Sequence, residues 1–307
     1  MGIRDRVPEQ LKPPLRRGRD AGISAWHAIE RALFPPMRPG CILIGAQKGG
    51  TSAFHRYMAS HPAVAPTAIK EINFFNCRSR YARGLDFYHA HFPPAAPWNQ
   101  AKITFDVTPG YLPNPNAATR IYDYKPDMKM IALLRDPVTR AYSAWQMYRR
   151  RYRKNRDWFF DWVRMCDASR GRESFVLRGP SFGECFEDDV LAELDVMAQG
   201  ETIEMPILTH GLYADQLERY LDLFSLDQIL VVSSERFRGE TQRVLEEVED
   251  FVGLPRHSWD EVDLTVYVGP YTHSVPPGVQ RMLTAFYAPR NQALFSILDR
   301  GFNWQGT

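Results

Sequence analysis

The chain has 307 residues, of which 44% are hydrophobic and 24% are charged, as in an ordinary soluble globular protein. Its net charge of +2 is too small to favour nucleic acid as a partner. The four cysteines show no Cys-x-x-Cys spacing, which argues against a zinc site or a disulfide framework. No apolar run approaches the roughly 20 residues that a membrane-spanning helix needs.

Residues 1–38 are interpreted as an N-terminal arm ahead of a main domain at residues 39–307. The arm starts with a charged stretch that contains proline and lacks the apolar core of a secretory signal. Residues 21–34 predict a short amphipathic helix, which either docks on its own domain or contacts a membrane peripherally. The apolar side chains of that helix are Ile23, Trp26, Ile29, Leu33 and Phe34. We expect a cytoplasmic protein without a transmembrane segment.

Residues 41–52, CILIGAQKGGTS, predict a buried strand, a glycine-rich turn and the start of a helix at 51–60. Gly45, Gly49 and Gly50 allow a tight turn in which several backbone N–H groups point at one anion. Lys48 adds a full positive charge, and the free N–H groups at the start of the helix also favour phosphate. We therefore predict a phosphate-binding loop; the alternative is a glycine-rich turn without a ligand.

This loop differs from the P-loop of nucleotide triphosphatases, in which the lysine directly precedes the Ser or Thr. Here two glycines separate Lys48 from Thr51. The nearest candidate for the aspartate that holds Mg²⁺ in such enzymes is Asp106 in KITFDV, and it matches that pattern poorly. The spacing therefore favours an anion site over an ATPase or GTPase.

Residues 69–75, IKEINFF, follow the first helix and place Glu71 among apolar neighbours. We expect an apolar surround for its carboxylate. Burial raises the pKa of a carboxyl group and makes it a better proton acceptor near neutral pH. Glu71 is therefore the candidate general base. The alternative is a surface pair of Lys70 and Glu71 beside a core strand.

The sequence LLRDPVTRAYS, residues 133–143, predicts a strand that ends at Arg135 and a helix over 137–152. Asp136 can cap this helix, and Pro137 suits its first turn. Arg135 offers a rigid fork for phosphate, and Ser143 adds a hydroxyl about two turns along. If this strand neighbours the first one, the two anion sites indicate a ligand with two separate phosphate groups. Alternatively, Arg135 pairs with a structural carboxylate and Ser143 faces solvent.

The remaining pattern alternates strands and helices, which predicts an α/β fold with a P-loop-like parallel sheet flanked by helices. Residues 153–205 break this rhythm and are interpreted as a helical insertion between the third and fourth strands, which shapes the acceptor side of the site. The expected strands are 41–45, 102–107, 128–134 and 228–233. The further expected helices are 115–124, 211–224, 240–252 and 276–300, the last of them broken near Pro289.

Four stretches taken in order resemble the sulfotransferase family that uses 3′-phosphoadenosine 5′-phosphosulfate (PAPS), and the heparan sulfate type in particular. They are GAQKGGTS, KEINFF, DVTPGYL at 106–112 and LLRDPVTRAYS. The resemblance continues through HGLYADQLERYLDLFSLDQILVVSSERF (210–237), VEDFVGLP (248–255) and FYAPRNQALFSILDRGFNW (286–304). The resemblance covers roughly residues 40–304, and the motifs occur in the same order as in the family.

The resemblance implies a role for each matching residue. The cradle of the 5′-phosphosulfate would be Lys48, Gly49, Gly50, Thr51, Ser52 and Ala53. Arg135 and Ser143 match the pair that binds the 3′-phosphate, and Glu71 matches the general base. Lys48 would also stabilise the leaving phosphate during sulfuryl transfer. PAPS carries the activated group as a co-substrate, so the resemblance implies no metal.

The chain departs from the heparan sulfate pattern at three places. Asn73 replaces a histidine, Val107 replaces a lysine, and residues 268–278 replace a basic loop. Tyr271 and His273 are the candidates for the place of that loop. These differences argue against a heparan-type acceptor and leave a glycan, a glycolipid or a hydroxylated natural product. The alternative functions are a P-loop-type small-molecule kinase and a non-catalytic relative that binds PAPS or its desulfated product, PAP.

Overall fold

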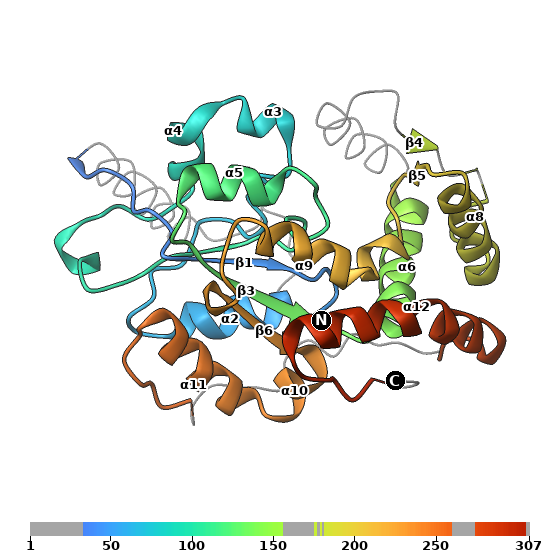
Figure 1. Cartoon of the computed structure of the whole chain (residues 1–307). Helices are drawn as coiled ribbons and strands as arrows, with labels where there is room; N and C mark the ends of the chain where they lie inside the picture. The colour runs from blue at the N-terminus through green and yellow to red at the C-terminus, as the bar shows by residue number, and fades with distance from the viewer. Residues whose placement is uncertain (1–32, 156–174, 177–178, 180, 260–273, 305–307) are drawn as a thin grey trace, which may run out of the picture.

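The structure, a computed structural model, describes residues 33–155, 175–176, 179, 181–259 and 274–304. Its centre is a parallel four-stranded sheet in the order β2–β1–β3–β6 (Figure 1). The strands are β1 (Cys41–Gly45), β2 (Phe105–Val107), β3 (Lys129–Leu134) and β6 (Ile229–Ser233). All four predicted strands are therefore confirmed, and their carboxyl ends meet at one edge because every pairing is parallel.

Helices cover both faces of this sheet. In Figure 1, α5 and α9 lie above it, and α2, α10 and α11 lie below it. The longer helices are α2 (Thr51–Ser60), α5 (Ala117–Tyr124), α6 (Pro137–Lys154), α8 (Phe186–Ala198), α9 (Tyr213–Leu221), α11 (Thr241–Val252) and α12 (Pro277–Leu298). The shorter ones are α3 (Arg78–Tyr81), α4 (Gly84–His89), α10 (Ser234–Gly239) and the 3-10 turns η3 (Pro97–Asn99), η4 (Thr209–Gly211) and η5 (Leu226–Gln228).

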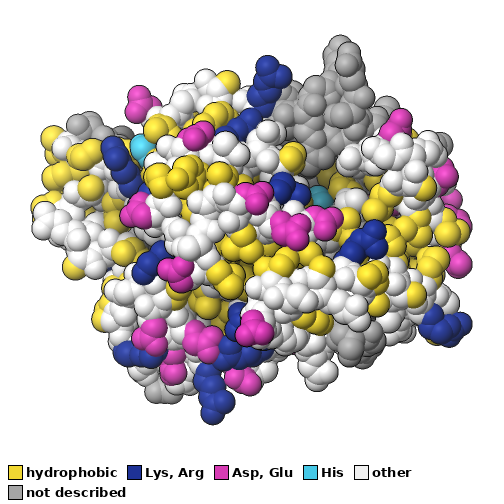
Figure 2. Space-filling view, viewed as in Figure 1, with side chains coloured by type: hydrophobic (Ala, Val, Ile, Leu, Met, Phe, Trp, Pro, Cys, Tyr) yellow, Lys and Arg dark blue, Asp and Glu magenta, His cyan; other side chains and the backbone are white. Residues whose placement is uncertain are grey.

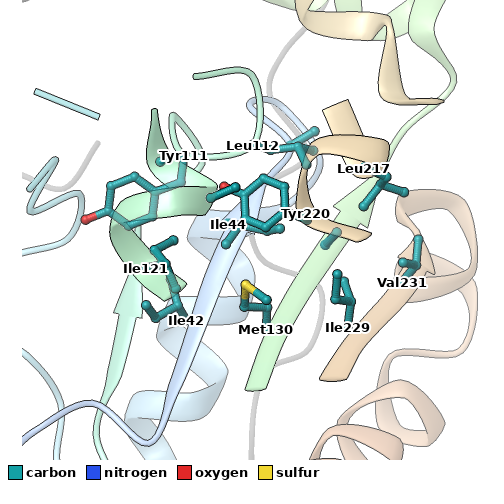
Figure 3. Packing of buried hydrophobic residues seen from close by; sticks show 14 of the residues in the cluster. Ile42, Ile44, Tyr111, Leu112, Ile121, Met130, Leu217, Tyr220, Ile229 and Val231 are labelled. Atoms are coloured by element: carbon teal, nitrogen blue, oxygen red, sulfur yellow. The ribbon is translucent and has the colours of Figure 1, made fainter. Parts of the chain in front are cut away.

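The strand side chains alternate between two apolar cores, as the period of two in a strand requires. Ile42 and Ile44 pack with Met130 on the face covered by α5 and α9 (Figure 3). Leu43 and Leu133 pack on the opposite face against residues of α2 and α11. Because the strands are buried on both faces, they read as continuous apolar runs, and this is why the sequence located them correctly.

Two features differ from the sequence analysis. The predicted break at Pro289 is wrong, because α12 continues through this proline. Pro289 and Ala285, whose carbonyl loses its helical donor, are both exposed, so water can satisfy that carbonyl. The insertion contains α8 as expected, and it adds a small parallel sheet of β4 (Phe175–Val176) and β5 (Thr202–Ile203). The predicted amphipathic helix at 21–34 lies almost wholly outside the described residues.

None of the helices in the described part of the chain combines the length and hydropathy that a membrane span needs. On the face seen in Figure 2, Lys and Arg side chains are interspersed with Asp and Glu and do not gather in one patch.

The buried His61 is the C-cap of α2 and fixes the C-terminal end of this helix. Its Nδ1 accepts the N–H of Ala63 at 3.0 Å, so its Nε2 carries the hydrogen and donates to the carbonyl of Pro255 at 3.1 Å. This arrangement needs a neutral ring. Burial lowers the pKa of His61, and it acts in the same direction on His55 and His89.

We expect the free energy of unfolding to fall as the pH drops below about 6.5, because the unfolded chain then binds protons that the folded histidines resist. His61→Gln should flatten part of this dependence. Urea unfolding at pH 7.5 and 5.5 measures it, with His91→Gln as the control for loss of a half-buried ring. Parallel pH curves for His61→Gln and the unaltered protein would show that His61 is not linked to proton binding.

Candidate active site

The glycine-rich turn joins β1 to α2 at the carboxyl edge of the sheet. A side chain at Gly49 would lie 2.1 Å from the carbonyl oxygen of Leu133, and Gly50 has a φ of 98°. Both positions therefore require glycine. The N–H of Gly49 bonds the carbonyl of Ala46 at 2.9 Å, which closes the turn.

The first turn of α2 has the features of an anion site. Gly50 is its N-cap, no side chain caps it, and no acidic residue lies in its first turn. The N–H groups at the start of a helix have no partner within the helix, so here they can donate to a bound anion. Thr51 and Ala53 are buried in this turn, and Ser52 is exposed.

Arg135 lies beside this turn, because β3 is the direct neighbour of β1. Its Nη1 lies 3.5 Å from the carbonyl oxygen of Lys48, a long hydrogen bond, and its Nε donates to Thr139 at 3.1 Å. The carbonyl of Arg135 accepts the Tyr213 hydroxyl at 2.9 Å, which fixes the end of the strand. The two strand ends therefore lie side by side, as the sequence predicted.

The helix after Arg135 starts as predicted. The Asp136 carboxylate accepts the N–H of Thr139 at 2.7 Å, and Pro137 is the first residue of α6. Ser143 follows two turns later and is fully buried. The alternative that Ser143 faces solvent is therefore wrong.

The sequence analysis missed three side chains at this turn: Gln47 in the turn itself, and Met147 and Tyr148 on α6. Lys48 Nζ lies 3.9 Å from the sulfur of Met147 on α6, and the Tyr148 hydroxyl donates to Gln47 at 3.0 Å. Met147 is four residues beyond Ser143, so it lies on the same face of α6. That spacing was the available signal.

Glu71 does not have the apolar surround that its neighbours predicted. Its side chain is 46% exposed and forms an ion pair with Lys70. Residues 71–74 belong to neither a helix nor a strand, and the φ of 64° at Glu71 lets Ile72 and Phe74 point inward while the carboxylate points outward. The surface pair that we gave as the alternative is what the structure contains.

The backbone of Glu71 nevertheless lies at the same sheet edge. Its N–H donates to the carbonyl of Val107 at 3.0 Å, at the end of β2, which pairs with β1. Burial lowers the pKa of His55 on α2, and the positive charge of Lys70 lowers it further. Glu71 and Lys48 therefore lie beside the carboxyl ends of two neighbouring strands, β2 and β1.

The insertion is attached to α6. Asp189 of α8 accepts the Trp145 indole N–H at 2.7 Å and the N–H of Gly183 at 2.7 Å. Glu193, also on α8, accepts the backbone N–H groups of residues 207–209. The hydrogen bond from Trp145 to Asp189 thus joins the helix that carries Ser143 to α8 of the insertion, and the two helices are neighbours in Figure 1.

A family model of the sulfotransferase domain matches residues 38–267. This chain belongs to the sulfotransferase family. Its sequence is 26% identical to the membrane-associated sulfotransferase kil1 of Dictyostelium discoideum, over 87% of this chain and 66% of that protein. It is 27% identical to heparan sulfate glucosamine 3-O-sulfotransferase 5 of Mus musculus, over 87% of this chain and 74% of that protein. The chain thus spans just under two thirds of the first of these relatives.

The crystal structure of a sulfotransferase from Alicyclobacillus acidocaldarius has the same fold, with a TM-score of 0.60 and 26% identity. The match covers 87% of this chain and 98% of that one. The recognition from sequence and the α/β fold class are confirmed, and the protein is a sulfotransferase. The candidates for the replaced basic loop, Tyr271 and His273, lie outside the described residues.

Proposed function

We propose that this sulfotransferase moves the sulfuryl group from PAPS to a hydroxyl or amine of an acceptor. The observation that carries the proposal is the position of Arg135 against the backbone of Lys48. Two cationic side chains on neighbouring strand ends suit a donor with two separate anionic groups. The buried Ser143 adds a hydroxyl on the helix that follows Arg135.

In this proposal the uncapped start of α2 and Lys48 bind the 5′-phosphosulfate, and Arg135 and Ser143 bind the 3′-phosphate. The acceptor oxygen attacks sulfur while the bond from sulfur to the bridging phosphate oxygen breaks, and PAP leaves. Negative charge develops on that bridging oxygen, where Lys48 and the amides of the turn stabilise it. Glu71 takes the proton of the acceptor hydroxyl.

The proposed acceptor is a glycan, or the glycan part of a glycolipid. The support comes from relatives whose names specify glucosamine in heparan sulfate. We further propose that the insertion lines the acceptor side, because it follows α6, which starts at the carboxyl edge of the sheet, where open parallel sheets bind their ligands. The substitutions at Asn73, Val107 and 268–278 make a heparan chain a poor first candidate.

Thermal-shift measurements with PAPS, PAP and ATP·Mg²⁺ test the donor, followed by transfer of labelled sulfate to glycans, glycolipids and hydroxylated natural products. We expect PAPS and PAP to stabilise the protein and ATP·Mg²⁺ to leave it unchanged. Stabilisation by ATP·Mg²⁺ alone would favour the kinase. Binding of PAP without transfer to any acceptor would favour the non-catalytic alternative.

A further inference from the structure

A buried carboxylate lies under the segment that carries Glu71. Asp106, in the middle of β2, is fully buried and accepts three hydroxyl hydrogens. The donors are Thr108 at 2.6 Å, Tyr111 at 2.7 Å and Tyr88 at 2.9 Å. A buried carboxylate with several donors is a costly group that a protein keeps where it fixes an arrangement.

Asp106 determines the direction of the hydrogen bonds that two of these hydroxyls make. Because Tyr111 gives its hydrogen to Asp106, its oxygen is left to accept the N–H of Phe74, which lies 3.1 Å away. Thr108 likewise donates to Asp106, and its oxygen lies 3.5 Å from the backbone nitrogen of Asn73. The carboxylate therefore turns both oxygens into acceptors for the backbone next to Glu71.

That backbone needs such support. Glu71 and Asn73 have φ values of 64° and 52°, in the left-handed region, which is uncommon for residues other than glycine and asparagine. Such a conformation persists where the surroundings over-determine it. Here the Asn73 side chain also donates to the carbonyl of Glu71 at 2.7 Å. Asn73 thus holds the segment together at the position where the heparan sulfate pattern has histidine.

We propose that Asp106 is a positioning residue for Glu71, acting through Tyr111 and Thr108 on the backbone of residues 71–74. The inference rests on the proposed role of Glu71 as the base that takes the acceptor proton. Asp106 itself does not touch substrate in this proposal. Its effect is to keep the exposed Glu71 carboxylate in the orientation that proton transfer requires.

Tyr88 provides a matched control. Its hydroxyl donates to the same oxygen of Asp106 as that of Tyr111, and both rings are buried in the same core. Among the residues that the structure describes, the Tyr88 hydroxyl bonds Asp106 alone. Tyr88→Phe and Tyr111→Phe therefore each remove one bond to the carboxylate, but the second also removes the acceptor for Phe74.

We expect Tyr111→Phe to lower kcat about tenfold, and Tyr88→Phe to change it less than about twofold. Tyr111→Phe should lose more thermal stability than Tyr88→Phe, because it also leaves the buried N–H of Phe74 without an acceptor, and both variants should keep the KM for PAPS. In a Glu71→Gln background, Tyr111→Phe should lower kcat no further, because its effect passes through Glu71. Equal effects of the two variants on kcat, or a further tenfold loss in that background, would overturn the inference.

A second pair of variants decides the matter if Tyr111→Phe fails to fold. Thr108→Val should lower kcat by about threefold or more, and Thr108→Ser should restore it by returning the hydroxyl. A Thr108→Ser enzyme as slow as Thr108→Val would count against positioning. If instead Glu71→Gln leaves kcat unchanged, the role of Glu71 fails first, and this outcome is distinct from failure of the inference.

Discussion

Lys48→Ala is expected to lower kcat about a thousandfold and to weaken PAPS binding. Lys48 follows β1 within three residues, in the turn that precedes the uncapped start of α2. In the proposed reaction its ammonium faces the bridging oxygen, where charge grows as the sulfur bond breaks. The loss should be larger in kcat than in binding, because the charge on that oxygen is greater in the transition state than in bound PAPS.

Initial rates of sulfate transfer and calorimetric binding of PAP measure these two effects separately. Lys125→Ala is the matched control, because Lys125 precedes β3 at the opposite edge of the sheet. This control should keep normal kinetics. Near-normal kinetics of Lys48→Ala itself would remove Lys48 from the mechanism.

Glu71→Gln is expected to lower kcat about a thousandfold while PAP binding stays largely intact. The amide keeps the shape of the side chain but cannot take the acceptor proton. Because Glu71 is paired with Lys70 on the surface, the exchange should cost little stability. Single-turnover transfer and PAP calorimetry on the same preparation distinguish chemistry from binding.

Added formate gives an independent measurement for Glu71. In Glu71→Ala, the small carboxylate can enter the vacated space and take the proton, so formate should raise the rate of that variant. Glu246→Ala, on α11, serves as the control and should show no response. If Glu71→Gln loses PAP binding and keeps turnover of the bound donor, Glu71 is a structural residue.

The residues of the proposed donor site could be predicted to lie together because their geometry is local. Lys48 follows β1 within three residues, and Arg135 follows β3 directly. In a parallel sheet such positions meet at one edge, so strand ends alone bring the two cations together. The helix starts at Thr51 and Pro137 were also readable, from the glycines and from the Asp-Pro pair.

The geometry of the proposed acceptor side could not be predicted in the same way because distant contacts determine it. The outward direction of Glu71 follows from a positive φ and from a bond to Val107, 36 positions along the chain. In the sequence, Asp106 matched the pattern of a Mg²⁺-binding aspartate poorly. Its proposed positioning role depends on Tyr88 and Tyr111, which the fold brings around its carboxylate. The two-residue strands β4 and β5 are too short to give a periodic signal.

The central claim is that two neighbouring strand ends bind opposite ends of one doubly phosphorylated nucleotide. Calorimetric binding of PAP and of AMP, which lacks the 3′-phosphate, to the unaltered protein and to Arg135→Ala tests this most directly. We expect the unaltered protein to bind PAP about 100-fold more tightly than AMP, and Arg135→Ala to bind the two within about threefold of each other. An Arg135→Ala protein that keeps the full preference for PAP would contradict the account.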